Sequence, residues 1–399
     1  ALGVLVSCGS VKSGEEAIAA SRESKVVVAY VTSWREVMPD PQYMTHINYA
    51  FGHVNESFNG VKIDNEERLR QIVDLRKQKP ELKVLLSIGG WGSGRFSEMA
   101  ANDEYRRAFA ADCDRVVKEF ALDGIDIDWE YPTSSMANIS SSPDDTENFT
   151  LLMQDIRAAI GNEKELTLAT VASARYIDFK AILPSVDFVN IMAYDMASAP
   201  KHHSALYPSG HSGDITSDGA VTAHLKAGVP PSKLVMGMAF YGRGGDGYPS
   251  FQDYNKVGNT DTQYTEKWDE VAQVPYLADK NDTLVFGFEN PRSLAIKCQY
   301  ILDKDLLGGM YWDYSGDNEQ GDLRRTVAEN LLGKPHKAKV LVLTERGGQH
   351  GGFTDAGLRW LAAEGVKGNF SITEINNARN ITEAYLSQFS LVIQLDFPP

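Results

Sequence analysis

Three carboxyl side chains stand two residues apart in the segment DGIDIDWEYP, residues 123–132. Asp126, Asp128 and Glu130 alternate there with Ile127 and Trp129. Side chains in an extended strand alternate between its two faces, so the three carboxyls share one face at a spacing of about 6–7 Å. Carboxylates this close on a buried face cannot all ionise, and the pKa of at least one is expected to rise. A carboxyl with a raised pKa can act as a general acid near neutral pH, and this is the chemistry that the row predicts.

Two other interpretations of the row are less well supported by its residues. A solvated acidic edge strand would more often carry lysine than the apolar stripe of Ile125, Ile127 and Trp129. A calcium loop needs small or polar residues and a turn glycine between its ligands, whereas isoleucine and tryptophan stand there. The pattern therefore favours a buried catalytic row.

The same segment resembles the DxxDxDxE signature of glycoside hydrolase family 18, the chitinase family, with Asp123, Asp126, Asp128 and Glu130 in the four acidic positions. Four further segments resemble strands of that family in the same order along the chain. They are LLSIGGW (85–91), MAYD (192–195), GMAFYGRG (237–244) and GGMYWDYSGD (308–317). The resemblance spans roughly residues 25–335.

The resemblance implies retaining hydrolysis of β-1,4 links between N-acetylglucosamine units, with the sugar's own 2-acetamido group as the nucleophile. Glu130 is expected to be the general acid, and Asp128 to hold the acetamido N–H. Asp126 is expected to share a proton with Asp128, so that the titrations of the two are coupled. Tyr194 is expected to donate a hydrogen bond to the acetamido oxygen. We expect neither a metal nor a cofactor.

Other residues are expected to line the sugar pocket. Trp312 is expected beneath the −1 sugar, because flat apolar sugar faces stack on indoles. Asp195 is expected to approach Glu130 or a sugar hydroxyl. Six residues match family positions around the same pocket, although core packing remains the alternative for each. They are Tyr30, Phe51, Trp91, Met192, Tyr241 and Arg243.

Some nearby residues are expected to have structural roles. Asp123 lies outside the two-residue alternation and is predicted to fix the start of the strand. Ser87 is expected, with Gly89 and Gly90, to permit close packing near the acids. The loop MASAPKHHSALYP after Asp195 lacks a tryptophan that many chitinases carry there. His202 and His203 on this loop have no acidic partner at ligand spacing and are predicted to be solvated.

The elements that must position these residues alternate β-rich runs with segments of helical period, which is typical of parallel α/β folds. Eight such strands predict a (β/α)8 TIM barrel, whose active site lies at the C-terminal ends of its strands. Trp34, Trp91, Glu130, Asp195, Arg243 and Trp312 fall at those ends. The predicted strands are 25–34, 45–54, 82–91, 124–131, 165–173, 187–195, 233–242 and 308–315.

Two segments do not belong to the repeating unit. Residues 243–290, between strands seven and eight, predict a short α+β-like insertion. The resemblance implies that it forms one wall of the substrate groove, and its shortness predicts a shallow groove. Residues 336–399 show a strand, a glycine-rich turn, a helix and another strand. This order resembles the opening of a flavodoxin-like α/β sheet, with similarity to trehalose-utilisation-type domains, and we expect this domain to be partial and truncated. The catalytic barrel is assigned to residues 25–335.

The N-terminal segment ALGVLVSCGS resembles the end of a bacterial lipoprotein signal, with L-V-S-C as its lipobox and Cys8 as the lipidated residue. A frayed apolar terminus is the alternative. Residues 1–24 are therefore expected to be a signal remnant and tether, and the protein to be anchored in the bacterial envelope or secreted. Cys113 and Cys298 lie in helix-like stretches and are predicted to be core residues.

Composition limits the partners. The 399 residues carry a net charge of −15, which disfavours nucleic acid and an anionic membrane surface and suits a neutral glycan. Membrane contact is expected only through the lipid anchor. The expected substrate is an N-acetylglucosamine-containing oligo- or polysaccharide. Two alternatives stay open: an endo-β-N-acetylglucosaminidase acting on N-glycan cores, and a non-catalytic chitin-binding lectin, although lectins on this barrel typically lose the acid.

Overall fold

The computed structural model describes residues 25–245, 248–257, 263–333, 338–344, 351–368, 370–375, 381, 386 and 389–395. The chain divides into two compact units, residues 1–333 and 334–399. Cys8, the predicted lipidation site, lies outside the described residues. The larger unit contains every other residue that the sequence predicts for the site.

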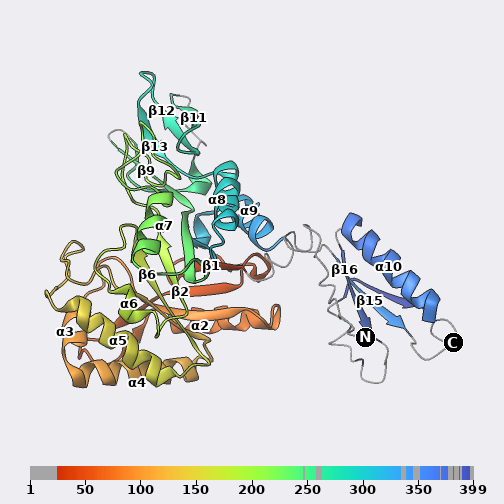
Figure 1. Cartoon of the computed structure of the whole chain (residues 1–399), viewed down its shortest axis with the longest axis horizontal. Coiled ribbons are helices and arrows are strands. Elements are labelled where there is room, and N and C mark those ends of the chain that lie inside the picture. The colour runs from red at the N-terminus through yellow and green to blue at the C-terminus, as the bar shows by residue number, and fades with distance from the viewer. Residues whose placement is uncertain are drawn as a thin grey trace, which may run out of the picture. The chain divides into compact units, whose positions relative to one another are not determined.

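A closed parallel barrel forms the centre of the larger unit (Figure 1). Within the described residues it has eight parallel strands, and it closes because β1 pairs with β2 on one side and with β14 on the other. This is the (β/α)8 arrangement that the alternating pattern predicts. The strands are β1 (Val26–Thr32), β2 (His46–Val54), β4 (Lys83–Gly89), β5 (Gly124–Asp128), β6 (Glu165–Val171), β7 (Phe188–Met192), β8 (Leu234–Ala239) and β14 (Gly308–Trp312).

Helices follow the strands and cover the outside of the barrel, and the short strand β3 (Val61–Ile63) pairs antiparallel with β2. The α-helices are α2 (Glu66–Val73), α3 (Phe96–Ala101), α4 (Asp103–Glu119), α5 (Asp145–Ile160), α6 (Phe179–Ile182), α7 (Ser217–Lys226), α8 (Pro291–Asp303) and α9 (Asp322–Leu331). The 3-10 helices are η1 (Pro41–Tyr43), η2 (Asp74–Lys77), η3 (Pro231–Lys233), η4 (Tyr254–Lys256) and η5 (Tyr314–Gly316).

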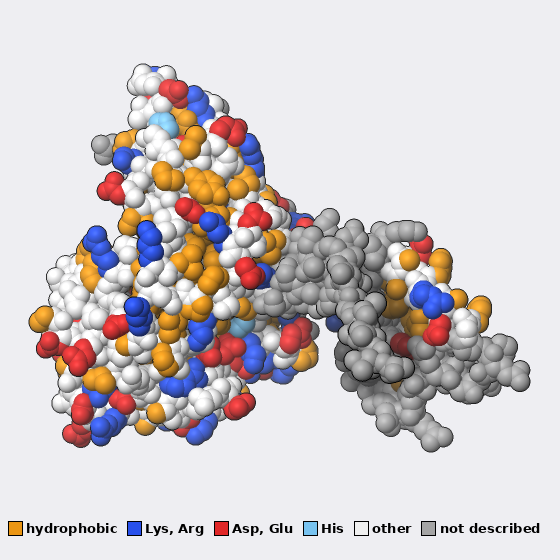
Figure 2. Space-filling view, viewed as in Figure 1, with side chains coloured by type: hydrophobic (Ala, Val, Ile, Leu, Met, Phe, Trp, Pro, Cys, Tyr) orange, Lys and Arg blue, Asp and Glu red, His pale blue; other side chains and the backbone are white. Residues whose placement is uncertain are grey.

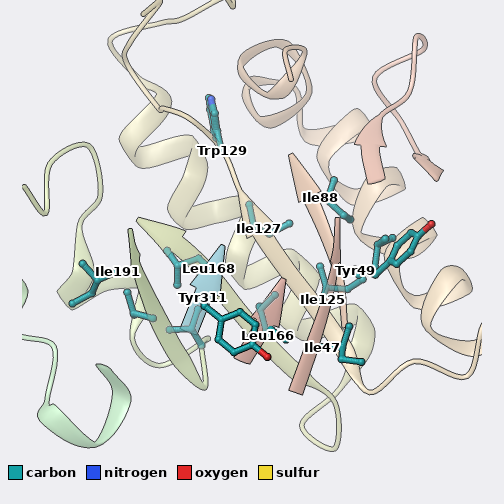
Figure 3. Packing of buried hydrophobic residues seen from close by; sticks show 14 of the residues in the cluster. Ile47, Tyr49, Ile88, Ile125, Ile127, Trp129, Leu166, Leu168, Ile191 and Tyr311 are labelled. Atoms are coloured by element: carbon teal, nitrogen blue, oxygen red, sulfur yellow. The ribbon is translucent and has the colours of Figure 1, made fainter. Parts of the chain in front are cut away.

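Two opposite faces of the strands build two separate layers of core. On β5, Ile125 and Ile127 belong to a large outer cluster that fills the space between strands and helices, and Figure 3 shows them among apolar residues of neighbouring strands. Asp126 and Asp128 alternate with them and so face the barrel interior. The apolar stripe thus anchors β5, and the row of acids inside the barrel follows from the same alternation. Trp129, just beyond the strand, continues the stripe in this outer cluster.

Local sequence signals set where several helices begin. Asn290 caps α8 by accepting the Ser293 N–H, and Ser293 Oγ accepts the Asn290 N–H in return, which completes a capping box ahead of Pro291. Asn102 caps α4 and Thr216 caps α7 in the simpler way, through one side-chain oxygen.

A sheet of five antiparallel strands stands between β8 and β14 in the described part of the chain, in the order β10-β9-β13-β12-β11. The sequence predicts a short insertion here. Figure 1 shows β9, β11, β12 and β13 at the opposite end of this unit from α4. The strands are β9 (Tyr241–Gly244), β10 (Gln252–Asp253), β11 (Thr265–Asp269), β12 (Val274–Ala278) and β13 (Leu284–Gly287).

The smaller unit contains, among its described residues, a parallel sheet with the order β16-β15-β17 and one long helix. Val340 and Val342 of β15 and Leu361 of the helix form its own apolar cluster. Its elements are β15 (Ala338–Thr344), α10 (Gly351–Gly368), β16 (Phe370–Ile375) and β17 (Leu391–Leu395). The flavodoxin-like assignment of this unit stays a prediction.

Seven of the eight barrel strands in the described residues end earlier than the sequence predicts, and only β2 ends where it predicts. The predicted fourth strand runs to residue 131, whereas β5 ends at Asp128, and the predicted seventh runs to 242, whereas β8 ends at Ala239. Apolar and aromatic residues continue beyond these ends, so the sequence pattern still favours a strand. The chain there no longer pairs with the neighbouring strands of the barrel. Glu130, Tyr194 and Tyr241 therefore lie on the segments that follow the strands.

The surface of the larger unit carries charges of both signs. Figure 2 shows acidic and basic side chains interspersed over its visible face. No helix among the described residues has the length and apolar content needed to cross a membrane.

Candidate active site

Asp126 is the innermost acid of the row and is fully buried. Four strands supply donors to its carboxylate. Burial raises its pKa above the usual range, although these hydrogen bonds oppose the shift. The donors are Tyr30 Oη (2.8 Å), Ser87 Oγ (2.8 Å), Thr167 Oγ1 (2.6 Å) and Asn190 Nδ2 (3.3 Å). With this number of partners, Asp126 is held in one orientation.

Asp128, one step closer to the barrel mouth, has a different environment. Its side chain is buried, and its Oδ1 finds no hydrogen-bond partner in the described part of the protein. Burial, followed by the charges of Glu130 and Asp126, raises its pKa well above the usual range. Asp128 therefore holds a proton more strongly than an ordinary carboxyl and has an oxygen available to an incoming group.

Glu130 follows the end of β5 and is partly exposed. Burial raises its pKa to about 7, a hydrogen bond with Tyr131 opposes the rise, and the charge of Asp195 adds to it. A carboxyl with this pKa is protonated in part of the molecules at neutral pH and can both donate and accept a proton there. This is the property that the sequence predicts for one member of the row.

Glycines and a backbone bond fix the top of β5 against β4. The Gly90 N–H donates to the Asp128 carbonyl at 2.9 Å. A Cβ on Gly89 would lie 2.0 Å from the same carbonyl, so no larger residue fits. At the other end of the strand, Asp123 accepts the Val84 N–H at 2.7 Å and pairs with Arg76. The glycines permit close packing and Asp123 fixes the start of the strand, as expected. Ser87 has an additional contact, because its hydroxyl donates to Asp126.

Asp195, just after β7, is held by an ion pair across the barrel mouth. Arg243 donates to both of its oxygens, from Nε at 2.7 Å and from Nη2 at 2.6 Å. Burial alone would raise the pKa of Asp195, but the bonds from Arg243 and His203 hold it well below the usual range. Asp195 therefore stays negative and contributes that charge to the environment of Glu130.

The prediction that His202 and His203 are solvated is wrong. Each is 1% exposed, and each has a carboxylate partner that its own loop sequence does not contain. His202 Nε2 lies 3.2 Å from Asp269 Oδ2, and His203 Nδ1 lies 3.5 Å from Asp195 Oδ1. The loop folds against β9 and β11, and contacts of this range cannot be read from spacing along the chain.

Aromatic rings surround Trp312 at the end of β14. Phe51 stacks on it with ring centroids 5.6 Å apart, Tyr30 lies at 5.6 Å, and Trp34 lies at 6.4 Å. Tyr30 and Phe51 are buried, whereas Trp34 is 57% exposed. The buried pair thus supports the indole from inside the barrel, while Trp312 and Trp34 remain open to a ligand.

A second aromatic group lies beside Glu130. Trp91 is 61% exposed, and its ring meets the edge of Tyr131 at 6.5 Å. Tyr131 stacks on Tyr176, from the loop after β6, at 5.5 Å. These three rings form an apolar surface next to Glu130, and only Trp91 among them is predicted from the sequence.

The remaining predicted residues lie between the acids and the insertion. Tyr194 is 9% exposed and donates to Met310 Sδ at 3.7 Å. Tyr241 is buried, with its ring 6.0 Å from that of Tyr194, and it stacks on Phe251 at 4.7 Å. Met192 ends β7 and packs against the cluster formed by these aromatics. All twelve predicted residues other than Cys8 are among the described residues, and six of them belong to one cluster inside the barrel.

Sequence reasoning missed several residues that contact the acids. Thr167 and Asn190 could have been found, because each sits at an inward-facing position of a predicted strand. Tyr131 stands directly after Glu130, but nothing in the sequence indicates that its phenol turns back to that carboxyl. The partner of His203 is Asp195, eight residues earlier, but no pattern in the sequence indicates that the loop folds back to bring the two together.

A cavity of about 950 Å³ lies elsewhere in the larger unit. It is lined by residues after β1 and β14 and by the insertion, including Met38, Tyr254, Glu266 and Asn318. No acid of the row lines this cavity, so the chemistry is assigned to the acids and not to the cavity. Within the described ranges no group of three or more His, Cys, Asp or Glu could hold a metal ion.

Comparisons with known proteins agree with this geometry. The model of the family described as glycosyl hydrolases family 18 matches residues 26–317. Chitinase A1 of Niallia circulans is 29% identical over 413 residues, covering 77% of this chain and 58% of that protein. Chitotriosidase-1 of Mus musculus is 30% identical over 350 residues, covering 74% of each. The solved structure of a glycoside hydrolase family 18 N-acetylglucosaminidase from Paenibacillus barengoltzii gives a TM-score of 0.71 at 32% identity, covering 77% of this chain and 99% of that one.

Proposed function

The chain belongs to family 18 of the glycosyl hydrolases and is a glycoside hydrolase, and from this premise we propose that it cleaves β-1,4 links between N-acetylglucosamine units of chitin or its oligomers by a retaining, substrate-assisted mechanism. The observation that carries the proposal is the pair formed by Glu130, with a pKa of about 7, and Asp128, with one buried oxygen unpartnered in the described structure. The first can protonate a leaving oxygen, and the second can receive an amide N–H.

In the first step Glu130 donates its proton to the glycosidic oxygen as the bond from that oxygen to C1 breaks. The carbonyl oxygen of the 2-acetamido group attacks C1 and forms an oxazolinium ring. Asp128, ionised as positive charge develops, accepts the acetamido N–H and stabilises the ring. Asp126 supports this change because its burial, which raises its pKa, lets it take the proton that the two aspartates share.

In the second step the Glu130 carboxylate removes a proton from water as the water oxygen attacks C1 and the bond from C1 to the acetamido oxygen breaks. Two displacements at C1 leave the product with the configuration of the substrate. Trp312 supports the −1 sugar by stacking, and Tyr194 turns its phenol from Met310 toward the acetamido oxygen. Trp91 and Tyr131 stack on the sugar that leaves.

The test is digestion of chitotetraose followed by NMR of the freshly released reducing ends, which should first appear as the β-anomer. Glu130→Gln should lose activity by about a hundredfold or more, since it removes the general acid. An α-anomer as the first product would overturn the retaining mechanism. A Glu130→Gln variant with full activity would overturn the assignment of the acid.

The same assay separates the alternative activity on N-glycan cores. A high-mannose glycopeptide is offered in parallel with chitotetraose, and the loop after Asp195 supplies the specific reason to do so. No tryptophan stands in this loop to stack on an outer sugar of a long chitin chain. Faster release from the glycopeptide would replace chitin as the proposed substrate and leave the acids in their roles.

We further propose that the protein is attached to the bacterial envelope through a lipid on Cys8. The support is the L-V-S-C sequence that ends an apolar run. Expression with labelled palmitate should give a labelled protein that partitions with membranes. The Cys8→Ser variant should be unlabelled, and equal labelling of both proteins would refute the anchor.

A further inference from the structure

We propose that His203 is a positioning residue for the general acid: it holds the Asp195 carboxylate, together with Arg243, where its charge acts on Glu130. The inference deepens the proposed function and rests on it. It concerns the loop between β7 and α7, in which the sequence carries two adjacent histidines with different partners.

The contacts of His203 converge on one residue. Its Nδ1 lies 3.5 Å from Asp195 Oδ1 and also 3.5 Å from the Asp195 backbone nitrogen. One face of its ring packs on Tyr241 with centroids 5.3 Å apart. Its Nε2 is buried and has no hydrogen-bond partner in the part of the chain that is described. Burying an unpaired nitrogen costs free energy, so a residue chosen for packing alone would be apolar here.

The backbone of the loop is anchored on both sides of the ring. The His203 carbonyl accepts the Met196 N–H at 3.0 Å, and the Ser204 carbonyl accepts a hydrogen bond from Lys297 Nζ at 2.5 Å. Lys297 is itself completely buried and paired with Glu289. The ring is therefore presented from a rigid loop, as positioning requires.

Asp195 links this ring to the reaction. Arg243 on β9 donates to both oxygens of Asp195, and His203 Nδ1, when it carries the ring proton, donates to Oδ1 from the loop. The negative charge so held raises the pKa of Glu130, after burial. Other titratable or charged groups around the ring, within the described residues, are Tyr241 and Arg243 on β9 and the adjacent His202. Of the two histidines, only His203 has the carboxylate of the site as its partner.

Substitutions can separate positioning from packing. His203→Phe keeps the ring on Tyr241 and removes both nitrogens, and we expect it to lower kcat on chitotetraose about tenfold to a hundredfold with little change in KM. The alkaline limb of its pH profile should move to lower pH, because a loosened Asp195 raises the pKa of Glu130 less. His203→Asn returns a polar atom near Nδ1 and should recover most of the rate, whereas His203→Gln places it near Nε2 and should not.

His202→Phe is the matched control, since His202 is equally buried on the same loop but bonds to Asp269. We expect it to lower the melting temperature and to leave the alkaline limb in place. If His203→Phe keeps both kcat and the limb of the wild type, or if both phenylalanine variants shift the limb equally, the positioning role is wrong.

A second measurement does not depend on turnover. In protein labelled with 15N-histidine, the Nδ1 resonance of His203, assigned from its loss in His203→Asn, should shift when Asp195 is changed to Asn, and that of His202 should not. An unchanged His203 resonance would overturn the contact even if the phenylalanine variant fails to fold. A wild type inactive on both glycans would overturn the proposed function instead, and the spectrum would still decide the contact.

Discussion

Asp126 accepts hydrogen bonds from four side chains, whereas no donor in the described structure reaches Asp128 Oδ1, and Glu130 stands beyond the strand. The three groups are chemically alike, and their surroundings separate their behaviour. Burial raises the pKa of all three acids; hydrogen bonds oppose the rise at Asp126, whereas neighbouring charges add to it at Asp128 and Glu130. Of the three acids, Glu130 lies nearest the mouth of the barrel. Its pKa of about 7 lets it exchange its proton near neutral pH.

The rate of hydrolysis should fall on the alkaline side as Glu130 loses its proton. Its pKa is raised to about 7, so kcat/KM is expected to fall above that pH, by about tenfold per pH unit once the group is ionised. Initial rates on chitotetraose measured across the pH range give the profile. A profile that is flat from neutral to alkaline pH would exclude Glu130 as the acid.

Replacing Glu130 by Gln should also change stability in a pH-dependent way. The folded pKa of about 7 lies above the ordinary 4.5, so the folded state binds the proton more tightly than the unfolded state does. The free energy of unfolding of the wild type therefore decreases as pH rises from 4.5 through 7, by up to about 3 kcal/mol. Glu130→Gln lacks this loss, and in urea unfolding it should be the more stable protein above neutral pH and equal to the wild type below 4.5. A constant difference at every pH would contradict the linkage.

At the scale of elements, the loop after β7 and the insertion are tied together by a buried ion pair. Lys297 on α8 and Glu289 after β13 are both 0% exposed, and Lys297 also donates to the Ser204 carbonyl beside His203. Ser293 Oγ donates to the second oxygen of Glu289 at 2.6 Å. One helix therefore fixes both a wall of the site and the loop that carries His203.

Breaking this pair from one side should be costly. Lys297→Met leaves the Glu289 carboxylate buried without its cation and should lower the free energy of unfolding by about 3–5 kcal/mol. Removing both charges in Lys297→Met with Glu289→Leu should cost less than the lysine change alone, because no uncompensated charge remains. Urea unfolding of the single and double variants measures the coupling. Additive losses would show that the two residues act independently.

The elements also show what the sequence can and cannot reveal. Alternation of Ile125 and Ile127 with the aspartates predicts which face of β5 enters the barrel, and alternation could equally have predicted Thr167. The end of a strand is harder, because Trp129 and Tyr131 favour extended chain although β5 stops at Asp128. The sequence does not indicate the partner of His202, because that contact joins segments 67 residues apart; it does not indicate that of His203 either, although Asp195 is only eight residues away, because the fold of the loop decides the contact. The local sequence pattern thus indicates which side chains of a strand face the barrel interior. The hydrogen-bond partners of a side chain depend on the tertiary fold.

At the scale of the whole molecule, the chain carries a net charge of −15 without a basic stripe on the face seen in Figure 2. A net negative charge of this size agrees with a neutral glycan as the proposed substrate and gives no support to a polyanionic substrate. The two compact units have separate apolar clusters, one built around the barrel and one around β15 and α10. Each unit therefore has a core of its own.

Because the barrel unit closes on itself through the pairing of β1 with β14, a chain of residues 25–333 should fold and hydrolyse without the smaller unit. We expect its kcat on chitotetraose to equal that of the whole chain, and its melting temperature to change by less than about 2 °C. Calorimetry of both proteins provides the check, with Glu130→Gln in the short chain as the inactive control. If the short chain is insoluble, or melts many degrees lower at equal activity, residues 334–399 contribute to the stability of the barrel and the two units are not independent.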